Sequence, residues 1–246
     1  MHWLLPKING VRVLMYHHVW NNADPLTITP ELLEKQFAYL KSENYRTITV
    51  SQLLNNIYNN EPLPEKTIVL TFDDGFLNQI EKVQPLLEKF GFTACIFLIG
   101  ENVVSASNQI HDTKYEHLSF ENIWKADKKY FEFGFHGYSH KALDKMTNQE
   151  FKSEIMLNKQ VFSAMNISVL PVLAYPYGNR PSDNKRMTEV KAIMKECGIK
   201  AAFRIGNSSI SFPVKDPYEL KRIDITGFDD LKRFRIKLKK GKLMPF

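Results

Sequence analysis

An α/β fold is predicted for this chain of 246 residues, and three observations predict it. Apolar runs rich in β-branched residues, typical of buried strands, alternate with amphipathic stretches typical of helices, which implies βα units and a mostly parallel sheet. The chain offers about seven such units, against eight in a full barrel of about 250 residues. No glycine- and serine-rich linker or shift in composition divides it, so a single domain is expected.

The predicted strands are short and apolar. Residues 67–70, Thr-Ile-Val-Leu, form the clearest one, and residues 93–99 form another that is apolar throughout. Runs of this length and composition are typical of buried strands. The full set of expected strands covers residues 11–16, 45–50, 67–70, 93–99, 131–135, 169–175, 201–204 and 220–225.

Capping signals and apolar stripes predict the helices between the strands. Thr29 followed by Pro30 is typical of a helix start, and Thr147 with Glu150 three residues later has the capping-box form. Ser51 is expected to cap a second helix, and the polar segment 100–117 is expected to be an irregular loop. The expected helices cover residues 30–40, 51–58, 78–90, 119–129, 147–165, 186–197 and 229–239.

Composition excludes several classes of protein. At 43% hydrophobic and 12% aromatic residues, the chain can build a full core. The net charge of +6 comes largely from basic residues near the C-terminus, so no nucleic-acid-binding groove is predicted. Cys95 and Cys197 have neither the number nor the spacing of a disulfide framework or a metal site, and both are expected to be buried.

The two ends of the chain carry further expectations. The N-terminal residues lack the apolar core of a signal peptide, and no apolar run reaches the 18 to 20 or so residues that span a bilayer, so a soluble cytoplasmic protein is the default. Residues 1–228 are expected to form the barrel domain, and residues 229–246 a basic helix and tail packed on it. Attraction of this helix to an anionic membrane or glycan is the alternative.

Polar residues gather where the predicted strands end. His17 and His18 end one strand, Asp73 and Asp74 another, and His136 a third. In a parallel βα barrel the carboxyl ends of all strands lie on one face, which carries the chemistry. A fourth strand ends in Tyr175-Pro176-Tyr177, and Arg222 and Asp224 lie in a fifth.

The pair of adjacent carboxylates indicates a bound cation or a proton taken up during chemistry. Asp73 and Asp74 repel each other, and in a site of low dielectric constant one of them would be driven towards neutrality. The alternative is that one aspartate caps the following helix and the other is solvated.

Two histidines four residues apart provide the other half of a metal site. His136 and His140 can face one point from a helix or a tight turn, and imidazole nitrogen is a good ligand for zinc. Together with a carboxylate from a neighbouring strand end they predict a site with three protein ligands and open positions, the catalytic pattern. The alternative is a pair of surface histidines.

Three motifs in this order resemble the polysaccharide deacetylases of the NodB-homology class: Thr71-Phe72-Asp73-Asp74-Gly75, His136-Gly137-Tyr138-Ser139-His140 and Tyr175-Pro176-Tyr177-Gly178. The resemblance covers about residues 11–225 and implies a distorted (β/α)7-type barrel. It implies that Asp73 is the catalytic base. It also implies that Asp74, His136 and His140 bind a divalent metal, most commonly zinc, with cobalt or nickel as alternatives.

The implied reaction is removal of an N-acetyl group from a sugar. Zinc lowers the pKa of a coordinated water to about 7, and Asp73 would take the proton as that water attacks the carbonyl. The backbone N–H of Tyr177 would help to hold the oxyanion, and a general acid must protonate the leaving amine.

Departures from the family pattern leave the general acid open. Gly137 stands where many members have serine or threonine, Ala174 stands near a common arginine position, and no histidine follows His140. The chain is similar instead to a rearranged branch, typified by biofilm poly-N-acetylglucosamine deacetylases, in which a Tyr-His element opens the domain. That similarity makes His17 the first candidate for the acid and His18 the second.

Each assignment has an alternative. His17 could be a hydrogen-bonded core histidine. Arg222 could orient Asp73 in place of the missing arginine, or form an ordinary structural ion pair. For the whole protein, the rivals to a metal-dependent carbohydrate N-deacetylase are a non-catalytic carbohydrate-binding relative and a two-His, one-carboxylate iron oxygenase. The sugar and the oligomeric state are not indicated.

Overall fold

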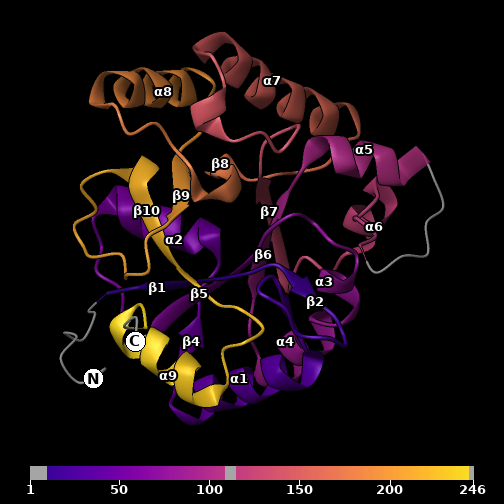
Figure 1. Ribbon diagram of the computed structural model, residues 1–246, viewed down its shortest axis with the longest axis vertical. Coiled ribbons are helices and arrows are strands. Elements are labelled where there is room, and N and C mark those ends of the chain that lie inside the picture. The colour runs from indigo at the N-terminus through magenta and orange to yellow at the C-terminus, as the bar shows by residue number, and fades with distance from the viewer. Residues whose placement is uncertain (1–9, 109–114, 244–246) are drawn as a thin grey trace.

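The strands form a closed parallel barrel, which confirms the predicted fold class. A computed structural model describes residues 10–108 and 115–243. Within this part, seven parallel strands make a ring, because β1 pairs with β5 on one side and with β10 on the other (Figure 1). In ring order the strands are β1 (Arg12–Tyr16), β5 (Thr67–Phe72), β6 (Ala94–Leu98), β7 (Phe131–Phe135), β8 (Val172–Ala174), β9 (Ala201–Ile205) and β10 (Leu220–Asp224).

Three short strands lie outside the ring. β4 (Arg46–Thr47) pairs with the first residues of β5, so the strand expected at 45–50 is short and peripheral. β2 (His18–Val19) and β3 (Thr27–Ile28) pair with each other beyond the carboxyl end of β1. They extend the wall of the barrel on the side of the polar strand ends.

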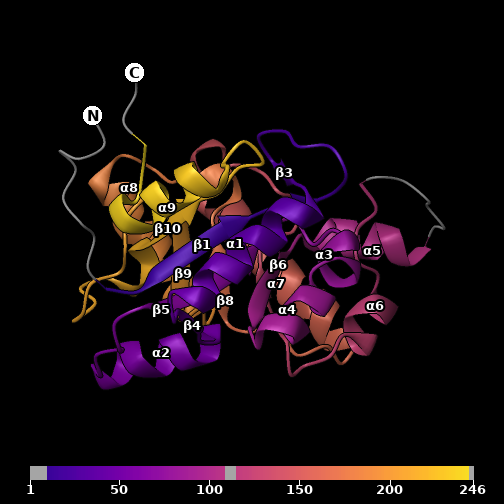
Figure 2. The same ribbon diagram turned by 90° about the horizontal axis from the view of Figure 1, so that it is seen from below.

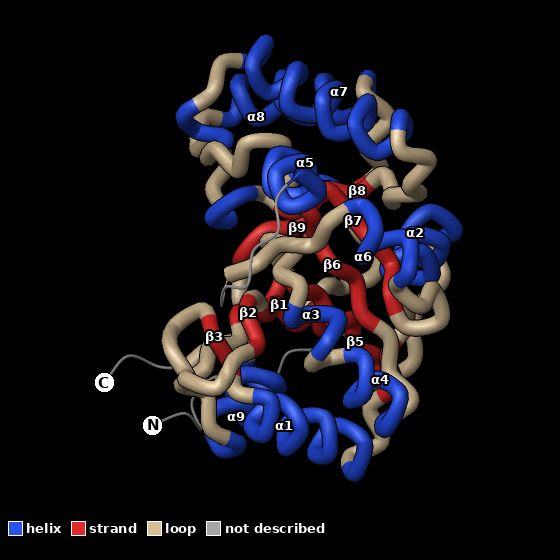
Figure 3. Tube along the Cα trace, turned by 90° about the vertical axis from the view of Figure 1, so that its right-hand side faces the viewer, coloured by secondary structure: helices blue, strands red, loops and turns tan. Residues whose placement is uncertain are grey.

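Helices surround the strands (Figure 3). α7 packs beside α8, and α9 packs beside α1, where Tyr39 and Phe234 meet edge to face (Figure 1). The helices are α1 (Pro30–Ser42), α2 (Val50–Asn59), α3 (Asn78–Glu81), α4 (Gln84–Phe90), α5 (Gly100–Asn108), α6 (Phe120–Lys125), α7 (Asn148–Ala164), α8 (Asn184–Glu196) and α9 (Leu231–Lys240). None of these helices in the described ranges combines the length and apolarity needed to cross a bilayer.

Apolar side chains fill the barrel and the layer between strands and helices. Val13, Val69 and Phe203 lie inside the ring and pack with Val50 and Leu53 of α2. α2 therefore closes the amino-terminal end of the barrel, beside β4 and the start of β5 (Figure 2). The opposite, carboxyl-terminal end is left for the polar residues.

The structure corrects three predicted elements. The helix expected over 78–90 is two helices, because Pro85 in the first turn of α4 has no N–H to donate and its ring would clash with a preceding carbonyl. α2 is capped by Thr49, with Gln52 completing the capping box, and not by Ser51. Residues 100–108, expected to be irregular, form α5, and residues 109–114 of that segment lie outside the described part.

Candidate metal centre

The carboxyl ends of the strands bring the predicted site residues together. Asp73 follows β5, His17 follows β1 and His136 follows β7. All three meet at one point, since the Nε2 atoms of His17 and His136 lie 3.9 and 3.8 Å from Oδ2 of Asp73. The motifs, far apart in the sequence, form one cluster because parallel strands place their ends on the same rim.

Asp73 is held by an arginine inside the barrel. The Arg222 guanidinium, on β10, donates from Nη1 to Oδ1 at 2.6 Å and from Nη2 to Oδ2 at 2.7 Å. Both side chains are almost inaccessible to solvent, and the guanidinium lies 5.4 Å from the Phe97 ring centroid. Burial acts to raise the pKa of Asp73, but Arg222, and after it His136, outweigh burial and hold that pKa below its usual range. Asp73 is therefore ionised at neutral pH.

Asp74 faces the two predicted metal ligands. Its backbone has φ of +73°, an uncommon value for a residue with a side chain. Oδ1 lies 3.5 Å from Nε2 of His136 and 3.5 Å from Nε2 of His140. Burial acts to raise the pKa of Asp74, but His136 and His17 together hold that pKa below its usual range.

These three side chains fit a divalent metal. One ligand atom from each of Asp74, His136 and His140 lies within 4.8 Å of the others. Two ligands about 2.0 to 2.1 Å from a zinc ion in tetrahedral geometry are about 3.4 Å apart, close to the separations found here. The same separations exceed the length of an ordinary hydrogen bond, and the carboxylate and the two imidazoles face a shared space.

Neighbouring groups set the state of each imidazole. Nδ1 of His136 is 2.9 Å from the carbonyl oxygen of Ala174, so Nδ1–H donates there and Nε2 is left to face Asp74. Burial acts to lower the pKa of His136, but the two carboxylates raise it above the ordinary value. Burial and then His136 lower the pKa of His140 to about 4, so His140 is neutral at pH 7.

The two adjacent histidines that follow β1 point in different directions. His17 reaches Asp73, and its buried Nδ1 has no hydrogen-bond partner among the described residues. His18 is buried, with Nδ1 3.2 Å from the Thr27 hydroxyl and its ring 4.9 Å from the Phe76 centroid. Successive side chains in extended backbone alternate between faces, so only His17 enters the cluster.

Tyr177 and Asp224 lie at the edges of the cluster. Tyr177 has φ of +57°, is 62% exposed, and its ring centroid is 4.6 Å from that of His140. Asp224 is half-buried, and burial raises its pKa despite the nearby Lys237. Neither side chain is among the three that converge as metal ligands.

Three residues that the sequence analysis missed hold the backbone of the two aspartates. The side-chain amide of Gln79 donates to the carbonyls of His17 and Asp73. Nδ1–H of His117 donates to the carbonyl of Asp74 at 3.1 Å, and the Asn102 amide donates to Nε2 of His117. No motif marks these residues, because Gln79 and His117 act through backbone carbonyls, and Asn102 through His117, that only the fold brings near.

The fold and site define a class of protein: a parallel βα barrel with a candidate two-His, one-carboxylate metal centre and a separate buried carboxylate at its carboxyl-terminal rim. The chain matches the family model for polysaccharide deacetylase over residues 60–202. More than half of the chain is covered, and the chain belongs to the polysaccharide deacetylase family. The resemblance seen in the three motifs is thereby confirmed.

Known proteins of similar sequence and structure agree with this assignment. YxkH of Bacillus subtilis (strain 168) is 24% identical over 177 residues, which cover 72% of this chain and 60% of that protein. The poly-beta-1,6-N-acetyl-D-glucosamine N-deacetylase of Staphylococcus epidermidis is 25% identical over 252 residues, covering 89% of this chain and 80% of the enzyme. Among solved structures, IcaB from Ammonifex degensii superposes with a TM-score of 0.79 at 20% identity, covering 95% of this chain and 99% of IcaB.

Proposed function

We propose that this protein is a metal-dependent hydrolase that removes N-acetyl groups from a glycan or a glycan precursor. One observation carries the proposal: the two adjacent carboxylates have different partners. Asp73 is held by Arg222, while Asp74 faces the two imidazoles. A base beside a metal site is the arrangement that hydrolysis of an amide needs.

Asp74, His136 and His140 would hold the metal, for which zinc is our first choice and cobalt or nickel the alternatives. When bound, such a metal polarises a carbonyl and makes a water molecule acidic enough to be deprotonated near neutral pH. His140 is neutral at pH 7, so its nitrogen is free to coordinate.

Asp73 would act as the general base through Oδ2, the oxygen nearest to His17 and His136. The carboxylate is ionised at neutral pH and is held in place by two hydrogen bonds from Arg222. The same arginine makes Asp73 a weak base, which suits a proton that a metal has already made acidic. We assign Arg222 the role of orienting this base.

His17 would act as the general acid and protonate the nitrogen of the leaving amine. Its Nε2 lies on the Asp73 side of the cluster, and its side chain is 15% exposed, so it can meet both substrate and solvent. The environment of His18, enclosed by Thr27 and Phe76, favours His17 over His18. We assign the backbone N–H of Tyr177 to the oxyanion, and its exposed ring to contact with the sugar.

An N-acetylated glucosamine polymer is the substrate we favour, because that is what the Staphylococcus epidermidis relative acts on. The basic face of α9 would provide a second contact with an anionic glycan or membrane. Lys232, Arg233 and Arg235 are exposed on this helix, whereas Lys237 is buried and paired with Asp229. We propose no nucleic-acid partner.

Acetate release tests the proposal directly. The purified chain, loaded with Zn²⁺, Co²⁺ or Ni²⁺, is expected to release acetate from N-acetylglucosamine oligosaccharides. Asp73→Asn should lower kcat by about 10² to 10⁴ fold, the usual contribution of a general base, and should still bind zinc. The matched control is Asp144→Asn, which removes an exposed carboxylate and should leave kcat unchanged.

Other outcomes would favour the rivals. Unchanged kcat in Asp73→Asn would contradict the assigned base. Sugar binding without acetate release would favour a non-catalytic binding protein. Oxygen uptake dependent on Fe²⁺ would favour an oxygenase.

A further inference from the structure

The loop that carries both imidazoles has a backbone that needs support. Between His136 and His140 the chain turns sharply, with φ of +80° at Gly137 and +56° at His140. A positive φ at a residue with a side chain is uncommon and persists where the surroundings hold it. The position of the His140 ring, and hence its distance from Asp74, depends on this turn.

One carboxylate holds the loop from the α7 side. Oε2 of Glu154 accepts hydrogen bonds from the backbone N–H groups of Tyr138 and Ser139, each at 2.8 Å. Oε1 of the same carboxylate accepts the Ser139 hydroxyl at 2.7 Å. Three donors from two successive loop residues, Tyr138 and Ser139, therefore bind the single carboxylate of Glu154 on α7.

The start of α5 holds the loop from the other side. The N–H of Gly100 donates to the carbonyl of Gly137 at 3.2 Å, and the N–H of Glu101 donates to the carbonyl of Tyr138 at 2.9 Å. A side chain at position 100 would not fit, because its Cβ would lie 2.2 Å from Oδ1 of Asn158. The loop backbone is thus fixed between Glu154 and α5.

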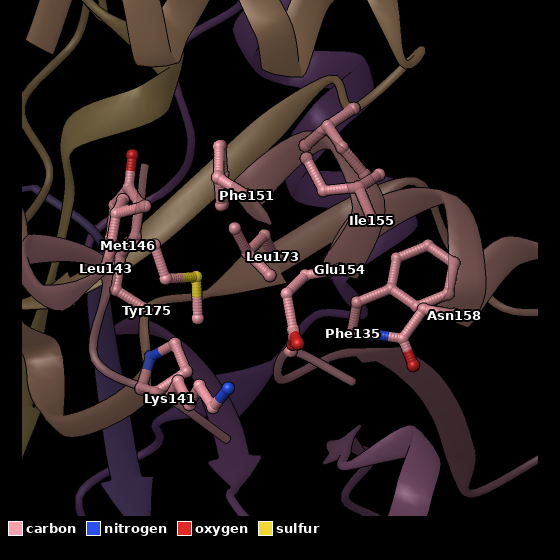
Figure 4. A pocket seen from close by; sticks show the side chains of 13 residues that line it. Phe135, Lys141, Leu143, Met146, Phe151, Glu154, Ile155, Asn158, Leu173 and Tyr175 are labelled. Atoms are coloured by element: carbon pink, nitrogen blue, oxygen red, sulfur yellow. The ribbon is translucent and has the colours of Figure 1, made fainter. Parts of the chain in front are cut away.

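Glu154 makes these bonds at the edge of a mainly apolar pocket (Figure 4). The pocket lies between α7 and strands β7 and β8, directly beside the loop, and Gly137 and Lys141 line it together with Glu154. Phe151, Leu173 and other apolar side chains form much of the remaining wall. In such surroundings a hydrogen bond to a charged acceptor is stronger than it would be in water, so losing it should displace the loop.

We propose that Glu154 is the positioning residue of the metal centre: by binding the Tyr138–Ser139 backbone it sets the convergence of His136 and His140 and thereby the affinity for zinc. This inference rests on the metal-binding role proposed above for the two histidines. Glu154 touches neither the metal ligands' nitrogens nor the reacting groups. It acts through the loop.

Zinc affinity of the purified full chain, measured by competition with a chromophoric chelator, is the test. Glu154→Ala should weaken zinc binding by about 10 to 100 fold, the usual effect of losing a group that orients metal ligands. Glu154→Gln should retain most of the affinity, because its amide oxygen can accept both N–H bonds and its NH₂ can donate to the Ser139 oxygen. The matched control is Glu196→Ala on α8, whose carboxylate makes an exposed ion pair with Lys152.

The comparison of variants separates positioning from charge and from stability. Equal losses in Glu154→Ala and Glu154→Gln would show that the negative charge matters and the hydrogen bonds do not, and would overturn the proposal. Wild-type affinity in Glu154→Ala would also overturn it. Affinity is measured at a temperature at which each metal-free variant is folded.

Ser139→Ala keeps the test decisive if Glu154→Ala does not fold. It removes one of the three bonds and should weaken zinc binding by less than Glu154→Ala is expected to, whereas an unchanged affinity would overturn the proposal. Because zinc binding is measured without substrate, a chain that binds zinc but releases no acetate would disprove the proposed function and leave this inference intact.

Discussion

Asp73 and Asp74 are neighbours in the sequence and both lie near His136, but their other partners differ. Asp73 is buried, faces into the barrel and is bound by two hydrogen bonds from Arg222. Asp74 is partly accessible, has a left-handed backbone conformation, and its Oδ1 lies 3.5 Å from Nε2 of each of two imidazoles. The difference teaches that two identical side chains, adjacent in the sequence, can be given different partners by the fold.

The interactions that hold the two aspartates in place also differ. The Asp73 side chain is fixed by an ion pair, whereas the backbone at Asp74 is held by His117 and the opposing imidazole loop is held by Glu154. An ion pair in the interior is costly to break on one side, because the remaining charge stays buried. Hydrogen bonds to a loop at the rim can be lost with a smaller effect on the whole fold.

The largest effect expected from this comparison is on stability. Arg222→Met should lower the free energy of unfolding by about 3 to 5 kcal/mol, because it leaves the Asp73 carboxylate buried without its partner. The measurement is chemical denaturation followed by circular dichroism. Lys89→Met is the matched control, since it removes the cation of an exposed pair with Glu34 and should cost at most about 1 kcal/mol.

A loss for Arg222→Met no larger than that of the control would contradict the structural importance of the pair. The double variant Asp73→Asn, Arg222→Met separates the two contributions. It should recover part of the lost stability, because no unpaired buried charge remains.

A smaller effect on the free energy of unfolding is expected when pH is varied. Because the pKa of Asp73 is held low in the folded chain, its contribution to stability is complete above the ordinary carboxyl pKa of about 4 and is lost as pH falls towards the lowered value. The difference in unfolding free energy between wild type and Asp73→Asn should therefore shrink as pH falls below about 4, where His136 is already protonated. A difference that grows below about pH 4 would mean that the Asp73 pKa is raised.

The smallest effect on catalysis is expected from substitutions on α9, far from both aspartates. Replacing Lys232, Arg233 and Arg235 by glutamine should leave the release of acetate from short soluble oligosaccharides unchanged, because these side chains are exposed. Sedimentation with anionic lipid vesicles, and separately with an anionic polysaccharide, should fall relative to wild type. Unchanged sedimentation would remove the proposed surface contact and leave the centre around Asp73 unaffected.

Most of the barrel could be predicted from local pattern, and the errors have local physical causes. The strand at 67–70 and the helix capped by Thr147 lie where expected, because apolar periodicity and capping chemistry depend on neighbours in the sequence. The single helix expected at 78–90 was wrong, because Pro85 cannot continue a helix and sits in the first turn of a new one, α4. The helix α5 was missed because polar residues at 100–108 give a weak apolar pattern.

The sequence by itself determined the order of strands and helices, the family, and the residue types from which a metal site could be made, because these follow from spacing and side-chain chemistry. The tertiary structure alone decided that His17 and not His18 faces Asp73, that Arg222 binds Asp73 with both terminal nitrogens, and that Glu154 holds the imidazole loop. These contacts join β10 to β5 and α7 to the loop after β7. Only closure of the barrel brings such distant segments to one rim, so no local pattern could have specified them.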